Sequence, residues 1–503
     1  MPQNGSFPPL SAGEAKAGSG ADLSLGPDAP AVLQDLVLLE KLAQFERDQL
    51  PERVVHAKGA GAFGSFELTH GMGRHTCADF LQEPGQKTDV FARFSSLSGE
   101  RGDSDAERDI RGFALKFYTR QGNYDLVGSN SPVFFIRDPI RFPELVHAQK
   151  RRRLDNLRSE ELKWDFWSQA PECLHQLMFL FSGRGIPASY RHMHGYGCHA
   201  FMWYNDRNEH FWVKYHVKTE QGARGLSDED AWKLKGQDPD HATRDLYEAI
   251  ARKEYPAWTI YVQIMTPEQT RAFPYDPFDP TKVWPHDLVP LKPLGRLVLD
   301  SMPESYFQDV EQAAFNPSSF VPGIAPSPDK MLQGRLFSCH EAQVHRLGSG
   351  YYSIGVNQTK GLHITELQNA RLRPGAAVLF AGVKALSARP PALPHGEPAQ
   401  RHSSGVMPVD YEQPAAFYGK VLDEEGRQAL LDNVASSLNR AARNIRIRSL
   451  IMFWKMNKTF ARRLAREVDI DVEDVETMAK LSFTELIRMT SQASPGTEAA
   501  KRA

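Results

Sequence analysis

The stretch FWVKYHVK, residues Phe211–Lys218, decides the fold, because its apolar residues recur at every second position. Successive side chains of a β-strand point to opposite faces, so this period predicts a strand with one buried face. Trp258–Met265 and Phe113–Phe117 alternate in the same way, while Val90–Phe94 and Val133–Ile136 are apolar enough to be fully buried strands. Several such strands with long connections between them predict an α+β protein built on an antiparallel barrel with helical insertions.

Composition restricts the classes of partner. The 503 residues are 41% hydrophobic and 24% charged, which is typical of a globular protein with a large core. The net charge of −2 gives no electrostatic reason to expect nucleic acid or an anionic membrane as a partner. No apolar run approaches the length needed to span a membrane.

Cysteine usage and the N-terminal sequence predict a reducing, cytoplasmic location. Four cysteines in so long a chain do not make a disulfide framework, and no CxxC pair suggests a zinc site. The first residues, MPQNGSFPPLSAGEAKAGSG, lack the basic and apolar regions of a secretory signal.

Changes in composition divide the chain into four parts. Residues 1–48 form an N-terminal arm, rich in small residues and followed by a helix near Leu33–Arg47. Residues 49–300 hold the barrel, with the apolar segment Ser159–Ser182 as a helical insertion. Residues 301–420 are proline-rich and predict a wrapping segment that is extended at Arg389–Pro398, and residues 421–503 are helical. The expected tail helices are Arg427–Arg443, Ile445–Arg466 and a third that starts near Asp471.

The stretch MLQGRLFSCHEAQVHR, Met331–Arg346, is the expected helix of the wrapping segment. Ser327-Pro328-Asp329 is a helix start signal and Gly348 a stop signal. Arg335 lies one turn before Cys339, so the two side chains can touch, and a nearby cation lowers the pKa of a thiol. The alternative is that Cys339 is a small buried core residue. One inward face is shared by Leu332, Leu336, Cys339 and Gln343.

Several motifs, taken in order, strongly resemble the haem catalase family from about residue 45 to residue 360. The resemblance implies an eight-stranded antiparallel barrel with an arm, a wrapping segment and a C-terminal helical layer. It also implies a homotetramer, one buried b-type haem per subunit in the barrel domain, and hydrogen peroxide as substrate. The motifs are Pro51–Gly59, Arg93-Phe94-Ser95, Asp125–Asp138, Arg184–Pro187, Arg191–Gly197 and Pro326–Phe337.

The resemblance assigns roles to individual residues. His56 is similar to the distal histidine, which takes a proton from one peroxide oxygen and returns it to the other so that the O–O bond breaks heterolytically. Ser95 is similar to the hydroxyl that orients this imidazole. Val55 and Phe134 would narrow the distal channel, and Phe142 would stack on the haem. Arg53, Arg93 and Arg346 would pair with the haem propionates, and Arg335, His199 and Asp329 resemble a relay behind the proximal ligand.

Two residues depart from the family pattern at the centre of the site. Ser129, followed by Asn130, stands where the family has its distal asparagine, and a serine loses one of the amide donors. Cys339 stands where the family has its proximal tyrosine, and a thiolate ligand to iron favours O–O cleavage. The cysteine sulfur is closer to its backbone than a phenol oxygen, so direct ligation needs the helix or the haem to move, or leaves room for water. His340 is a less suitable ligand, because one helical step rotates it by about 100°.

Two further features concern access and a second cofactor. The continuation of the family after the helix is not recognisable in Gln358–Pro414, so the resemblance implies a remodelled entrance. NADPH is a further cofactor that some members of the family hold, although His194 replaces the usual asparagine here. The matching positions are His175, Phe179, Ser182, Arg184, Tyr196, Lys218, Val283, Trp284 and His286.

Three functions are consistent with these residues. The first is a haem oxidoreductase that reacts with hydrogen peroxide or an organic hydroperoxide, with a cysteine ligand and peroxidase or peroxygenase chemistry on an organic substrate. The second is an ordinary catalase that dismutates hydrogen peroxide. The third is a non-catalytic haem-binding scaffold, which the presence of His56 and of the propionate arginines disfavours.

Overall fold

A computed structural model describes residues 23–360 and 405–491, and the chain divides into the units Met1–Glu52 and Arg53–Ala503. In the first unit, helix α1 (Leu36–Arg47) begins at Asp35, whose carboxylate accepts a hydrogen bond from the Leu38 amide. None of the helix's residues is buried. The predicted extension of Arg389–Pro398 and the first part of the predicted arm lie outside the described residues.

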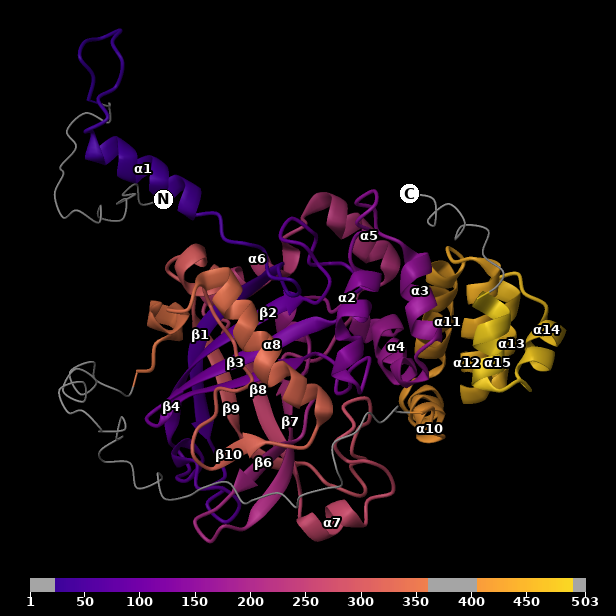
Figure 1. Ribbon diagram of the computed structural model, residues 1–503. Helices are drawn as coiled ribbons and strands as arrows, with labels where there is room; N and C mark the ends of the chain where they lie inside the picture. The colour runs from indigo at the N-terminus through magenta and orange to yellow at the C-terminus, as the bar shows by residue number, and fades with distance from the viewer. Residues whose placement is uncertain (1–22, 361–404, 492–503) are drawn as a thin grey trace. The chain divides into compact units, whose positions relative to one another are not determined.

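An eight-stranded antiparallel barrel forms the centre of the second unit, as predicted (Figure 1). The ring closes because β7 pairs with both β5 and β8, and β6 (Phe201–Tyr204) and β10 (Ile324–Pro326) extend the sheet beyond it. The predicted strands at Phe211–Lys218 and Trp258–Met265 are β7 and β8, which pair along their length. The strands of the ring are β1 Gly59–Leu68, β2 Lys87–Ser96, β3 Arg111–Thr119, β4 Gly122–Ser129, β5 Gly195–Tyr196, β7 His210–Thr219, β8 Ala257–Met265 and β9 Lys292–Ser301.

Large apolar side chains fill the barrel interior. Phe94, Phe113 and Trp258 contact one another with ring centroids 4.9 to 5.8 Å apart, and all three are buried. Each such side chain contributes roughly 1.5–3 kcal/mol through burial. Successive side chains of a strand point to opposite faces. Arg93, Ser95 and Gly112 are the sequence neighbours of Phe94 and Phe113, so they face outward, toward the helices that cover the barrel.

Helices form a second core beside the barrel (Figure 1). The insertion at Ser159–Ser182 is helical as predicted, and its Trp164 packs against Phe453 of the tail. Helix α8 (Lys330–Leu347) lies across the outside of the barrel, with Asp329 as N-cap and Gly348 as C-cap, as predicted. The other helices are α2 Phe142–Gln149, α3 Glu160–Ser168, α4 Leu174–Phe181, α5 Asp228–Gln237, α6 His241–Ala251, α7 Pro267–Arg271, α10 Val409–Ala416, α11 Glu424–Leu438, α12 Arg443–Met456, α13 Lys458–Glu467, α14 Val472–Met478 and α15 Phe483–Ser491.

Two predictions of secondary structure were wrong. Val133–Ile136 is not a strand but an irregular segment, and its apolar side chains are buried against helices rather than in the sheet. The predicted helix Ile445–Arg466 is two helices, because the Asn457 backbone is extended and its side chain caps α13 through the Phe460 amide. Asparagine competes with the helix for backbone hydrogen bonds, so it favours such a break.

A buried ion network joins the tail to the barrel side of the molecule. The Asp410 carboxylate on α10 pairs with the Arg137 guanidinium and, at 2.7 Å, with the Lys282 ammonium. Asp279 pairs with the same guanidinium at 3.2 Å. These four side chains come from three distant parts of the sequence, and α10 supplies the Asp410 carboxylate that both cations contact.

Replacing Asp410 by asparagine is expected to lower the free energy of unfolding by about 3–5 kcal/mol, because two buried cations lose their shared carboxylate. Urea denaturation followed by circular dichroism measures this. The matched control is Glu268→Gln, which breaks an exposed ion pair with Arg271 and should leave the midpoint unchanged. Equal midpoints for Asp410→Asn and the unmodified chain would show that the network does not stabilise the fold.

Candidate functional site

His56 precedes β1 and is fixed from three sides. Its backbone has a φ of 66°, which few non-glycine residues adopt, and its amide donates to the Leu97 carbonyl at 3.0 Å. The Arg93 guanidinium donates to the His56 carbonyl at 2.8 Å, and the Ser95 hydroxyl lies 3.0 Å from its Nδ1. The structure thus brings together three residues that the sequence analysis singled out, and leaves Nε2 as the nitrogen turned away from Ser95.

Gly112 on β3 makes room for the His56 ring, and the sequence analysis missed it. A Cβ atom at this position would lie 2.3 Å from the Ser95 Oγ and 2.8 Å from the His56 Nδ1. Gly112 pairs with Ser95 across the sheet, so the absence of a side chain here allows the imidazole to lie over the strand. A lone glycine in a strand often marks such a close approach, but nothing in the sequence says what approaches it.

Replacing Gly112 by alanine is expected to displace the imidazole and to reduce at least tenfold the rate of the peroxide consumption that the family resemblance implies. A Cβ within 3 Å of both side chains cannot be accommodated without moving one of them. The rate is measured with an oxygen electrode. Gly102→Ala is the control and should retain the full rate, because a Cβ at this position meets none of the described atoms within 4 Å. Gly122 is unsuitable as a control, because an alanine there would be strained by the positive φ. A Gly112→Ala protein with the unmodified rate would mean that the ring position does not matter.

The electrostatic environment keeps the His56 imidazole neutral. Burial, together with the positive charges of Arg93, Arg335 and Arg53, lowers the pKa of His56 to about 3. A neutral imidazole can accept a proton at neutral pH, which is the property that general base catalysis requires.

Three guanidinium groups surround a single carboxylate, and a fourth lies near two of them. Glu311 is 3.3 Å from Arg53, 3.2 Å from Arg101 and 3.6 Å from Arg346, all measured between nitrogen and carboxylate oxygen. Arg93 adds a fourth positive charge that acts on Arg53 and Arg346, and its buried Nε has no hydrogen-bond partner among the described residues. Burial lowers the pKa of Arg346 to about 10 and that of Arg53 well below its usual range. Arg53, Arg93 and Arg346 were predicted from the sequence, whereas Glu311 and Arg101 were not.

Helix α8 turns one face toward the barrel, and Cys339 lies on that face. Leu332 is buried in the barrel core, the Gln343 amide donates to the Phe315 carbonyl at 3.2 Å, and Arg346 binds the Glu311 and Ala313 carbonyls. Cys339 lies between these residues and is half-buried. The neighbouring His340 is exposed and its Nδ1 is 3.0 Å from the Tyr351 hydroxyl, so it points elsewhere, as helical geometry predicts.

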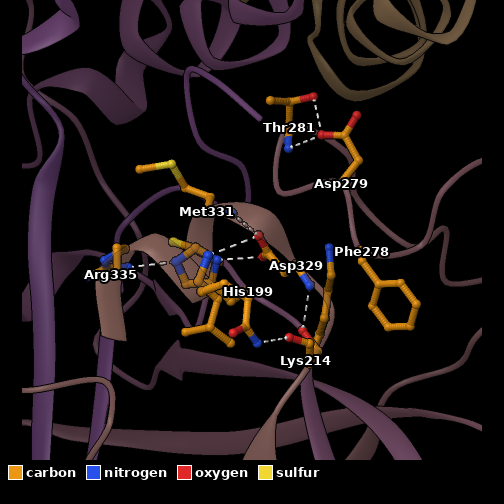
Figure 2. Close-up of polar contacts among 12 residues, drawn as sticks. His199, Lys214, Phe278, Asp279, Thr281, Asp329, Met331 and Arg335 are labelled. Carbon is orange, nitrogen blue, oxygen red and sulfur yellow. Dashed lines mark hydrogen bonds and ion pairs between the residues drawn. The ribbon is translucent and has the colours of Figure 1, made fainter. Parts of the chain in front are cut away.

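A relay of three buried or half-buried side chains lies beside the first turns of α8 (Figure 2). The Arg335 guanidinium donates to the His199 Nε2 at 2.7 Å, and the His199 Nδ1 is 2.6 Å from the Asp329 carboxylate. Because guanidinium nitrogens only donate, Nε2 accepts and Nδ1 carries the proton. Arg335 was expected to touch Cys339, but its hydrogen bonds among the described residues go to His199 and to the Val127 carbonyl.

The hydrogen bonds of Ser129 and Asn130 are directed to neighbouring groups. The Ser129 hydroxyl donates to the Ser131 carbonyl at 3.0 Å and lies 3.1 Å from the Cys198 sulfur. The Asn130 amide accepts from the Arg111 amide at 2.9 Å and donates to the Arg184 carbonyl at 3.1 Å. The donor of Ser129 is therefore already used, and Asn130 secures the end of β4.

Apolar side chains gather at Val55, and a separate cavity lies between the helical insertion, α5 and α11. Phe134 and Phe142 stack with ring centroids 6.3 Å apart, and Val55 is partly buried against the same cluster. This cavity of about 300 Å³ is lined by Ser98 and by charged side chains that include Arg108, Lys163 and Asp228, and His56 is not part of its lining. Its wall also includes Asp109, Gln149, Trp167 and Phe135.

The residues that resemble a nicotinamide site form a cationic and aromatic cluster. The Lys218 ammonium donates to the Tyr196 hydroxyl at 2.9 Å, and Arg184 lies over Phe179 at 5.2 Å. Phe417 of the tail packs on Phe179 with ring centroids 4.5 Å apart. Burial lowers the pKa of His175 to about 3, so this histidine is neutral. The other members are Ser182, His194, Val283, Trp284 and His286.

The residues at the main site fit a haem. The unpartnered Arg93 Nε and the excess of guanidinium groups over carboxylates leave positive charge for two propionates. Val55, Phe134 and Phe142 supply apolar surface for a flat ring, and the half-buried Cys339 supplies a sulfur on the barrel-facing side of α8. A cysteine side chain is shorter than a tyrosine side chain. The charge of a thiolate sits on its sulfur, whereas the charge of a phenolate is spread over its ring.

Comparisons with known proteins agree with this geometry. The sequence profile of the catalase family matches residues 10–379, and a profile described as catalase-related immune-responsive matches residues 409–468. A catalase of Methanosarcina barkeri is 45% identical over 485 residues, which are 93% of this chain and 95% of the relative. A catalase of Sus scrofa is 45% identical over 461 residues, or 89% of this chain and 87% of the relative.

Solved structures show the same fold. Catalase A from Saccharomyces cerevisiae superimposes with a TM-score of 0.84 at 36% identity, covering 92% of this chain and 98% of the yeast chain. A fungal catalase gives a TM-score of 0.82 at 38% identity and covers 91% and 95% of the two chains.

Proposed function

The chain belongs to the catalase family of haem-dependent, peroxide-using oxidoreductases, and on that premise we propose that it dismutates hydrogen peroxide to water and dioxygen. The observation that supports this proposal most directly is the neutral His56 imidazole, which lies over Gly112 and contacts the Ser95 hydroxyl, while Arg93 holds the His56 backbone carbonyl. The relatives named above are called catalases, whereas none of their names describes a peroxygenase.

His56 is the residue that moves protons in this proposal. Its Nε2 takes the proton from one peroxide oxygen and returns it to the other, so that water leaves as a neutral molecule. Ser95, at 3.0 Å from Nδ1, keeps the ring in one orientation during both transfers. Because the hydroxyl of Ser129 is bonded to the Ser131 carbonyl, His56 works without a second donor from that position.

The residues that would hold haem b are those around Glu311 and on the barrel-facing side of α8. Arg53, Arg93 and Arg346 would bind the propionates, Phe142 would stack on the ring, and Cys339 would face the iron. When bound, haem supplies a redox-active iron that exchanges electrons with peroxide. The relay from Arg335 through His199 to Asp329 fixes the orientation of the guanidinium next to this turn of the helix.

Oxygen evolution from the haem-loaded protein tests the function. We expect one dioxygen for every two peroxides consumed, with no organic donor present. Cys339 favours a second candidate, peroxidase or peroxygenase chemistry on an organic substrate, because thiolate ligation promotes O–O cleavage. If peroxide is consumed only when an organic donor is added, and no oxygen appears, the second candidate replaces the first. A protein that binds haem and consumes no peroxide would be a scaffold.

The pH profile of peroxide consumption follows from the His56 environment. Because the pKa of His56 is lowered from 6.5 to about 3, its ring stays neutral well below pH 6.5, and the rate should not halve near that pH. In the unfolded chain the His56 imidazole takes up a proton near pH 6.5, whereas in the folded chain it does so only near pH 3. The free energy of unfolding should therefore fall as the pH decreases from 6.5 toward 3. Stopped-flow rates from pH 4 to pH 8 check the profile, and a midpoint near 6.5 would contradict it.

Assembly, location and a second cofactor complete the proposal. Helix α1 exposes large apolar side chains, which supports a homotetramer in which other subunits cover this helix; they are Leu36, Leu39, Leu42 and Phe45.

All four cysteines are free, which supports a cytoplasmic or other reducing location. None of the described helices has the length and apolarity to cross a membrane. NADPH binding at the Arg184 and Lys218 cluster stays a prediction.

A further inference from the structure

Lys214 is a buried lysine whose charge the mechanism above does not use. It lies on the outer face of β7 with 6% of its surface exposed. Its ammonium donates to the Lys282 carbonyl at 2.9 Å and lies 5.2 Å from the centre of the Trp284 ring. Among the described residues, no carboxylate forms an ion pair with it within 4 Å.

Such a lysine is unfavourable for folding, which calls for an explanation. A buried cation without a paired anion loses hydration that is not fully replaced. Burial lowers the pKa of Lys214 to about 8, and the nearby charges of Asp329, Asp279 and Asp276 oppose that shift. Lys116 is a contrasting case in the same barrel, because it binds both oxygens of Asp125 at 2.7 and 2.9 Å.

The Lys214 side chain lies beside the Asp329 carboxylate (Figure 2). Asp329 has two tasks: one oxygen accepts from the Met331 and Leu332 amides and caps α8, and the other binds the His199 Nδ1. Asp329 is 1% exposed and His199 is 2% exposed, so solvent does not screen a charge placed next to them.

We propose that Lys214 is a positioning residue that acts on the proximal relay through Asp329. Its positive charge compensates the buried negative charge of Asp329. The Asp329 oxygen accepts the proton of the His199 Nδ1, which leaves Nε2 as the acceptor for Arg335. Arg335 is thereby held one turn from residue 339. The inference goes beyond the proposed function but rests on the placement of haem next to α8.

Charged and titratable groups face Lys214 from each neighbouring segment. Asp329 precedes α8, Cys198 belongs to the connection before β6, and the segment 276–284 contributes both acidic and basic groups. Asp279 is itself occupied by Arg137, whereas Asp329 and Asp276 have only neutral hydrogen-bond partners among the described residues, and of these two Asp329 acts more strongly on Lys214. The groups are Asp276, Asp279 and Lys282 on that segment, Cys198 and His199 before β6, His216 on β7 and Asp329.

Three substitutions in the haem-loaded protein separate charge from packing. Lys214→Gln can still donate to the Lys282 carbonyl but has no charge, Lys214→Met has neither property, and Lys214→Arg keeps the charge. We expect equal shifts of the iron midpoint potential to more negative values in Lys214→Gln and Lys214→Met, because a nearby positive charge favours the reduced state. Lys214→Arg should stay close to the unmodified protein.

A double-mutant cycle tests whether the effect passes through Asp329. Asparagine at 329 can still cap the helix but carries no charge. In the Asp329→Asn background, the shift caused by Lys214→Gln should fall below half of its value in the unmodified protein. Lys116→Met is the control for the loss of a buried lysine over an aromatic ring, and it should leave the potential unchanged.

Two outcomes would overturn the proposal. An unshifted potential in Lys214→Gln would show that only packing or the hydrogen bond matters, and this variant remains informative if Lys214→Met does not fold. A shift of full size in the Asp329→Asn background would show that Lys214 does not act through Asp329. Neither readout needs peroxide turnover, so a haem-loaded protein that fails to evolve oxygen still tests Lys214.

Discussion

Replacing His56 by asparagine is expected to reduce the rate of oxygen evolution by about 10²–10⁴-fold, which is the range that one general acid–base group supplies. Asparagine tolerates the left-handed backbone of this position, where φ is 66°, better than alanine does. It can donate and accept hydrogen bonds but cannot take up a proton at neutral pH. The size of the effect should be near the upper end, because Ser129 offers no free donor to share the task.

The His56→Asn experiment needs a control for haem loading and for the loss of any histidine. The absorption spectrum gives the haem content of each preparation, so rates are compared per haem. His241→Gln removes an imidazole on α6 that binds the Ala188 carbonyl at 3.1 Å, and it should retain the full rate. A loss of less than tenfold in His56→Asn would show that His56 does not carry the proton transfer.

The parts of the fold that depend on local sequence could be predicted. Alternation located β7 and β8, and capping signals placed the ends of α8 correctly at Asp329 and Gly348. β5 is only two residues long and carries no readable period, although it is needed to close the ring. Val133–Ile136 has the composition of a buried strand, but its burial comes from helices that are distant in sequence.

Site residues could be predicted where they belong to a short sequence motif. Site residues that come together only through contacts between distant segments could not. His56, Ser95, Arg93 and the relay residues came from motifs that resemble a known family. Gly112, Glu311, Arg101 and Lys214 became visible only through contacts across strands or between segments up to 258 residues apart. A glycine that admits a ring, or a carboxylate shared by guanidinium groups, leaves no periodic signal in the chain.

Replacing Cys339 by tyrosine is expected to change the spectrum of the bound haem and to restore or raise the rate of oxygen evolution. Cys339 lies on the barrel-facing side of α8, between Arg335 and Gln343, so a longer side chain there extends toward the haem side. A phenolate reaches farther than a thiolate and gives less electron donation to iron. The ferrous carbonyl complex provides the measurement, because thiolate ligation produces a strongly red-shifted Soret band.

Cys339→Ser and Cys173→Ser complete this test. Serine keeps the size of the side chain but removes the sulfur, so any red-shifted band should disappear in Cys339→Ser. Cys173 is buried in the helical core and has no place at the haem, so its replacement should leave the band unchanged. If the tyrosine and serine variants at 339 both keep the spectrum and the rate of the unmodified protein, residue 339 is not at the iron. The proximal ligand must then come from another residue or from water, and the thiolate chemistry that favours an organic substrate loses its basis.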